Sequence, residues 1–245
     1  MTPYWVLAGA ALGAIVGSFL ATLVLRWPLG RSVVKGRSQC DQCGGRLRAS
    51  ELVPIISFVA ARGRCRGCKA PIAPFHPVVE LSAAALGGAA LWLAPDPRGL
   101  VLALLWWQLL ALALLDARHF WLPDRLTLLL AASGLALGGL LWGEPLLDRL
   151  IGGVAGFAAL ALIGAGYRRL RRRDGLGGGD PKLFGALGCW LGWAALAPVV
   201  LIAALAGLGI AIAGRKPRFA ALPLGTFLAA GAAIWSGIQL ARSVA

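Results

Sequence analysis

The apolar stretch LFGALGCWLGWAALAPVVLIAALAGLGIAIA, residues 183–213, decides the fold of this 245-residue chain. At about 1.5 Å per residue it would form about 46 Å of helix. One crossing of a bilayer core takes about 30 Å, so the stretch is too long for one helix and too short for two full ones. The basic residues on either side decide between these readings, because Lys and Arg gather in cytoplasmic loops.

The basic residues of the chain are concentrated in a few short segments. Both segments that flank residues 183–213 are basic, so both are expected on the cytoplasmic side and the stretch is expected to cross twice. Two short helices with a break near Pro198 would achieve this. Of the 24 Lys and Arg residues, ten lie in 26–69, two in 118–125, six in 168–182 and three in 215–218.

The composition is that of a membrane protein, with 59% hydrophobic and only 14% charged residues. Together with residues 183–213, the other apolar stretches predict an all-α polytopic protein of about eight transmembrane helices. Both termini are then expected outside the cytoplasm. The first stretch has no basic residue before it, so it is expected to be a retained helix and not a signal peptide. The other stretches are 4–25, 78–95, 98–116, 121–143, 146–167 and 219–241.

The net charge of +14 does not call for a nucleic-acid partner. It is explained by membrane orientation and by attraction to anionic lipids of the inner leaflet. The predicted domains are a first helix (1–25), a basic cytoplasmic cysteine domain (26–77) and a seven-helix membrane domain (78–245). Two segments rich in small residues, 86–94 and 152–166, are expected to be helix-packing faces.

Four of the five cysteines lie in the cysteine domain as two pairs, CDQC (40–43) and CRGC (65–68). This spacing is typical of a zinc ribbon, in which four thiolates hold one structural ion. Disulfides are the alternative, but the cytoplasm keeps thiols reduced. A thioredoxin-like pair is not favoured, because no βαβ pattern surrounds it. The expected zinc ligands are Cys40, Cys43, Cys65 and Cys68, while Cys189 is expected to be a small buried side chain.

Three aspartates border helices at their cytoplasmic ends: Asp116, Asp124 and Asp180. Asp180 and Asp124 each suit a helix N-cap. Asp116 lies at a helix C-terminus, where the helix dipole disfavours an anion. Two carboxylates that share a proton can cleave a peptide, so Asp180 is a candidate catalytic residue with either Asp116 or Asp124.

The dipole argument predicts that Asp180 is the ionised member of such a pair and that Asp116 holds the proton. Next to Asp180 the chain carries three glycines that would let a substrate backbone approach closely. These expected active-site loop residues are Gly177, Gly178 and Gly179.

Several motifs in order resemble the bacterial prepilin peptidases, which are membrane aspartic proteases with a Gly-x-Gly-Asp signature. The resemblance covers nearly the whole chain. It rests on GSFLATLVLRWP (17–28), CDQC (40–43), ELVPIISF (51–58), GRCRGCKAPI (63–72), HPVVEL (76–81), DARHFWLPDRLTL (116–128) and GLGGGDPKLFGALGCWLGW (175–193).

The resemblance implies that Asp116 and Asp180 are the catalytic aspartates and that Asp124 is a neighbour. It also implies that the protein cuts basic leaders from type IV prepilins or type II secretion pseudopilins at the cytoplasmic face of the inner membrane. N-methylation of the new terminus with S-adenosylmethionine, with the cysteine domain as the methylating part, is implied as well. Ala21, Asp41 and His76 depart from the family pattern, and these departures concern the methylating part.

Because such leaders are basic, Asp124 and Glu80 are expected to contact them. A presenilin-like or signal-peptide-peptidase-like protease is the alternative enzyme, and it lacks such a cysteine domain. A transporter or scaffold with acidic ion sites is the alternative from another class. A transporter of this kind would have acidic residues deep within its helices, whereas the acidic candidates of this chain border basic loops.

Overall fold

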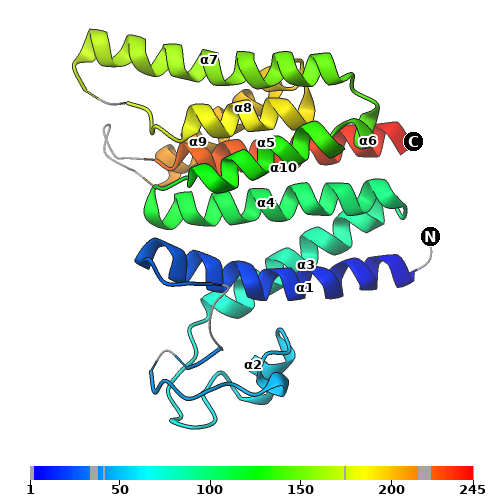
Figure 1. Cartoon of the computed structure of the whole chain (residues 1–245), viewed down its shortest axis with the longest axis vertical. Coiled ribbons are helices and arrows are strands. Elements are labelled where there is room, and N and C mark those ends of the chain that lie inside the picture. Colours follow the sequence, from blue (N-terminus) through cyan, green and yellow to red (C-terminus); the bar gives the residue numbers. More distant parts are fainter. Residues whose placement is uncertain (1–2, 34–37, 41, 174, 215–221, 245) are drawn as a thin grey trace. The chain divides into compact units, whose positions relative to one another are not determined.

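The computed structural model describes residues 3–33, 38–40, 42–173, 175–214 and 222–244. These residues form helices and no strand (Figure 1). They belong to two compact units, Met1–Pro95 and Asp96–Ala245, which are described separately. The helices are α1 (Pro3–Arg26), α2 (Ile56–Ala60), α3 (Phe75–Leu93), α4 (Pro97–His119), α5 (Asp124–Leu137), α6 (Gly139–Trp142), α7 (Leu146–Arg171), α8 (Asp180–Leu191), α9 (Leu196–Ala213) and α10 (Leu224–Val244), with 3₁₀ turns η1 (Trp27–Leu29) and η2 (Ala49–Glu51).

Seven helical segments in the described residues are long and apolar enough to cross a membrane. The all-α polytopic prediction is therefore confirmed. α8 is not among these segments, because its 12 residues are too few to span a bilayer. The candidate spans are Pro3–Leu29, Phe75–Leu93, Pro97–His119, Asp124–Trp142, Leu146–Arg171, Leu196–Ala213 and Leu224–Ser243.

The stretch 183–213 divides into two helices as predicted, but not at the predicted place. α8 ends at Leu191, and its C-cap Gly192 has a φ of 75° that favours glycine. α9 begins at Leu196. Pro198 lies in the first turn of α9, where no intrahelical hydrogen bond is lost by the missing N–H. The expected break near Pro198 is therefore wrong, and the glycine provides it.

In the first unit, α1 packs along α3 through small residues. A Cβ atom at Gly9 or Gly13 would collide with the backbone of α3 at Gly87 or Ala83. The two backbones can approach this closely only because neither position carries a side chain. The prediction that residues 86–94 form a packing face is confirmed for Gly87.

In the second unit, α8 is surrounded by other helices. It packs against α7 and α5, and eleven of its twelve residues are buried. Figure 1 shows α8 beneath α7. Gly152 and Gly156 of α7 meet the α8 backbone at Gly188 and Phe184, so the predicted packing face in 152–166 is confirmed for these two glycines. On the α5 side, Trp190 Nε1 donates to the Leu130 carbonyl at 2.7 Å.

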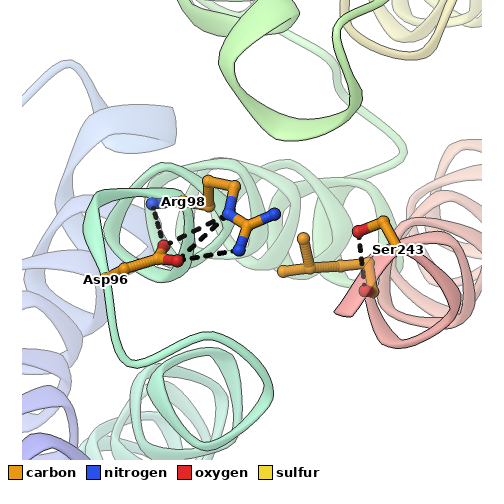
Figure 2. A network of polar contacts seen from close by, with 4 residues as sticks. Asp96, Arg98 and Ser243 are labelled. Atoms are coloured by element: carbon orange, nitrogen blue, oxygen red, sulfur yellow. Dashed lines mark hydrogen bonds and ion pairs between the residues drawn. The ribbon is translucent and has the colours of Figure 1, made fainter. Parts of the chain in front are cut away.

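Two charged groups fix helix ends in this unit. Asp96 caps α4, since its carboxylate accepts the N–H of Arg98 at 2.7 Å and pairs with the guanidinium at 2.9 Å (Figure 2). Arg149 of α7 is buried, and its Nη1 donates to the carbonyls of Gly134 and Leu135 where α5 gives way to α6. These contacts satisfy backbone groups that a helix end would leave unpaired.

The close approach of α7 and α8 generates a prediction. Gly152→Ala would place its Cβ 2.7 Å from the Gly188 oxygen and 2.8 Å from the Gly192 carbonyl carbon. Backbone atoms cannot move aside without separating the helices, so we expect a loss of about 1–3 kcal/mol in stability. Thermal unfolding of the purified protein in micelles should show a lower midpoint. Gly166→Ala on the same helix is the matched control, because nothing lies within 4 Å of its Cβ. Equal midpoints for the two variants would contradict this packing.

Candidate active site

Asp116 lies in the last turns of α4 and is buried. Its Oδ2 accepts the backbone N–H of Thr226 at 2.7 Å. The Thr226 Oγ1 lies 3.1 Å from the same oxygen and 3.1 Å from the Ala113 carbonyl oxygen, so the two acceptors share its one hydrogen. The first turn of α10 therefore orients this carboxylate, and one helix N-terminus faces it.

Asp180 is the first residue of α8 and is also buried. Its Oδ2 accepts the N–H of Gly177 at 3.0 Å, so the glycine loop folds back over the carboxylate. α8 has Gly179 at its N-cap and no side-chain cap. The alternative that Asp180 serves only as an N-cap is therefore wrong.

The two carboxylates meet around Gly225 and Leu122. A Cβ at Gly225 would lie 3.0 Å from Asp116 Oδ2 and 2.8 Å from Leu122 Cδ1. A Cβ at Gly179 would lie 2.6 Å from Leu122 Cβ, so Leu122 fills the space between the glycine loop and α10. The backbone of Gly225 faces both Asp116 and Asp180. Elements far apart in sequence thus bring the predicted pair together.

The charge of Asp116 contributes to the electrostatics of Asp180. Burial, and secondly the charge of Asp116, raise the pKa of Asp180 to about 6. Burial opposes ionisation at both aspartates. Asp116 faces the backbone N–H and the hydroxyl of Thr226, whereas the described hydrogen bond to Asp180 comes from Gly177 alone. Hydrogen bonding therefore favours the ionised form more at Asp116 than at Asp180, a contribution of α10 that the helix dipoles of α4 and α8 do not include.

Asp124 is placed differently. It is the first residue of α5, whose N-cap is Pro123 without a side-chain cap, so the predicted capping role is wrong here too. Its side chain is 73% exposed, and its Oδ1 accepts a hydrogen bond from Lys182 Nζ at 2.6 Å. This ion pair joins the starts of α5 and α8 at the surface.

Glu80 belongs to the first unit, on α3. It is buried, and its Oε2 accepts the N–H of Ile55 at 2.7 Å, just before α2. Of the two residues predicted to contact a leader, Asp124 is therefore the exposed one. Glu80 already has a structural partner.

The four predicted ligand cysteines form one cluster in which all Sγ atoms lie within 4.8 Å of one another. Cys40 and Cys68 Sγ are 3.9 Å apart, close to the roughly 3.8 Å separation that a tetrahedral zinc ion with Zn–S bonds of about 2.3 Å imposes. All are free thiols, and their donor set and spacing fit one metal ion.

The two cysteine pairs occupy matching turns. The turn after each pair passes through a left-handed residue, Gly44 with φ 67° and Lys69 with φ 61°. An isolated bridge closes each turn, Gln39 with Arg46 and Arg64 with Pro71. Of the other residues singled out in the sequence, Cys189 is a buried side chain beside Gly153, as predicted. Ala21 is buried in α1, His76 lies in the first turn of α3, and Asp41 lies outside the described residues.

Sequence reasoning missed the residues that support the aspartates: Leu122, Gly225 and Thr226. The segment LPLGTF (222–227) reads only as the start of an apolar helix. Proline before it and glycine within it mark a helix boundary, but nothing in the pattern points to a partner 110 residues away.

The fold and site define a polytopic membrane protein with a buried aspartate pair and a four-cysteine domain. Residues 102–212 match the type IV leader peptidase family, and residues 11–94 match the bacterial peptidase A24 N-terminal domain. The chain belongs to the type IV leader peptidase family.

Its relatives include three prepilin leader peptidase/N-methyltransferases. That of Burkholderia pseudomallei (strain 1026b) is 40% identical over 91% of this chain and 82% of the relative. The protein of Aeromonas hydrophila is 40% identical over 79% of this chain and 68% of the relative. The protein of Pseudomonas aeruginosa is 34% identical over 98% of this chain and 93% of the relative. No solved structure shows a significant match.

The contact between Gly225 and Asp116 generates a second prediction. Gly225→Ala would force its methyl group against Asp116 Oδ2 and Leu122, so the carboxylate must move. Displacing a reacting group by about 1 Å can cost about 100-fold in rate. We expect cleavage of a prepilin to fall at least about tenfold. Gly209→Ala in α9, with nothing within 4 Å of its Cβ, should cleave normally. Equal cleavage rates for the two variants would show that the carboxylate next to Gly225 does not take part in cleavage.

Proposed function

We propose that the chain is a membrane aspartic endopeptidase that removes the basic leader from a type IV prepilin or a type II secretion pseudopilin. The observation that carries the proposal is the meeting of two buried carboxylates, Asp116 and Asp180, at the start of α10. Family membership and the names of the relatives support the substrate class. The proposed place of the reaction is the cytoplasmic face of the inner membrane.

The geometry supports a division of roles between the aspartates. Asp116, with Thr226 on its Oδ2, takes a proton from the attacking water. Asp180 gives its proton to the carbonyl oxygen of the scissile peptide as the water oxygen bonds to the carbon. When the C–N bond breaks, Asp116 passes its proton to the leaving amine and Asp180 recovers one from the collapsing diol. Gly178 has nothing within 4 Å of its Cβ position, which leaves room for a substrate backbone.

The proposed orientation follows the basic loops, with the cysteine domain in the cytoplasm and both termini outside it. Both termini lie on the same side when α8 and the residues that flank it complete an eighth crossing beside the seven longer helices. The leader's basic residues are proposed to meet Asp124, which would exchange its ion pair with Lys182 for one with the leader. Glu80 is proposed as a second contact of the leader, and this contact requires its hydrogen bond to the N–H of Ile55 to open.

N-methylation of the new terminus is the second proposed activity, supported by the names of the relatives. S-adenosylmethionine is the proposed co-substrate, and the cysteine domain is the proposed methylating part. The proposed ion in the cysteine cluster is zinc, held by four thiolates without an open ligand position, so its role would be structural.

The test of the peptidase is a comparison of three variants on a purified prepilin. Asp116→Asn and Asp180→Asn should abolish cleavage, because each removes a proton donor or acceptor. Asp124→Asn removes an exposed ion pair and weakens the proposed leader contact but leaves both proposed catalytic carboxyls, so it should retain most activity. Mass spectrometry of the product with S-adenosylmethionine should also show the added methyl group in the wild type. Normal cleavage by Asp116→Asn together with loss in Asp124→Asn would overturn the proposed pair.

The test of the metal is separate. Wild-type protein should contain about one zinc per chain, and Cys43→Ser should lose most of it, because an incomplete ligand set binds weakly. Cys189→Ser, outside the cluster, is the matched control and should keep its zinc. Limited proteolysis should then cut the cysteine domain of Cys43→Ser faster than that of the control. Metal-free wild-type protein with paired disulfides would contradict the proposal.

A further inference from the structure

The first unit exposes a group of large apolar side chains outside its long helices. They belong to α2 and to the segment between η2 and α2. Side chains of this kind are normally buried, and such a group on one surface marks an interaction site. We name as the apolar face Leu52, Val53, Ile56 and Val59, which are 43%, 41%, 67% and 68% exposed within the chain.

The apolar face is held beside the end of a membrane helix. Glu80 lies in the second turn of α3, a candidate span, and its carboxylate accepts the N–H of Ile55. Ile55 has a φ of 62°, which is unusual for a β-branched residue and is kept in place by this contact. The hydrogen bond therefore fixes α2 near the level at which α3 enters the bilayer.

A basic group follows the apolar face directly. Its members are Arg62, Arg64, Arg66 and Lys69, all exposed. They line a cavity of about 500 Å³ together with Ala60, Ala61 and Cys65. Only Arg66 has an acidic neighbour in a described ion pair, Glu51 at 4.0 Å. Positive charge thus gathers around a hollow next to exposed apolar surface.

We propose that residues 52–69 dock on the anionic lipid surface of the membrane that holds the chain. The apolar face enters the boundary between acyl chains and headgroups, and the basic group meets lipid phosphates. Lipid fits both halves of this surface at once. A basic leader would instead be repelled by the four positive charges. The inference goes beyond leader cleavage and does not depend on it.

The test is hydrogen–deuterium exchange of the full chain in nanodiscs, followed by mass spectrometry. Phosphatidylcholine discs are compared with discs that contain about 40% phosphatidylglycerol, a composition chosen to give a strong negative surface potential. Amides of residues 55–62 should exchange at least about threefold more slowly in the anionic discs, because docking closes solvent access. Equal exchange in the two discs, whether fast or slow, would overturn the proposal. Slow exchange in both would show that another part of the protein covers the face.

Two variants separate the halves of the surface. Arg62→Gln with Arg64→Gln should remove the difference between the discs, and Ile56→Gln with Val59→Gln should give fast exchange in both. Arg169→Gln with Arg171→Gln at the end of α7 is the charge-matched control and should keep the difference. Metal content equal to that of the wild type shows that each variant is folded. A lipid-dependent difference that survives loss of Arg62 and Arg64 would contradict the role of the basic group.

Discussion

The two hydrogen-bond donors of Thr226 that face Asp116 Oδ2, its backbone N–H at 2.7 Å and its hydroxyl at 3.1 Å, form the contact on which the site depends. It joins the end of α4 to the start of α10 and leaves one carboxylate with a fixed acceptor oxygen. Asp180 then meets this carboxylate from the start of α8, where its Oδ2 accepts the N–H of Gly177. Gly225 must lack a side chain for the two to meet, since a Cβ there would touch Asp116.

The position of Asp180 rests in turn on helix packing. α8 is short. Its position is set by direct contact of its backbone at Gly188 with the α7 backbone at Gly152, where neither residue has a side chain. The indole of Trp190 ties its other side to α5. The proposed catalytic Asp180, on a short buried helix, can thus be held as firmly as a residue on a helix that spans the membrane. The cysteine domain belongs to the other unit, where small residues again bring two helices, α1 and α3, into contact.

The membrane helices and the cysteine cluster could be predicted from patterns of neighbouring residues in the sequence. Apolar lengths and basic loops predicted the helices, and cysteine spacing predicted the cluster, because both signals are confined to neighbouring residues. The break lies at Gly192 and not near Pro198, because a proline in a first helical turn costs no hydrogen bond and a positive φ at a glycine is not visible in the sequence. Asp124 and Asp180 were assigned caps they do not make, since a helix start in sequence does not reveal what the side chain meets. Thr226 could not have been found, because its partner is set by tertiary packing alone.

The most direct measurement of the central claim is the rate of leader cleavage by Thr226→Val and Thr226→Ser. Valine keeps the size of threonine and the backbone N–H but removes the hydroxyl beside Asp116 Oδ2, whereas serine retains it. Loss of a hydrogen bond to a charged group costs about 1.5–3 kcal/mol, so kcat of the valine variant should fall about 10- to 100-fold with little change in KM. The serine variant should cleave nearly as fast as the wild type. A valine variant with wild-type kcat would contradict the claim that the Thr226 hydroxyl at the start of α10 holds the carboxylate in its working position.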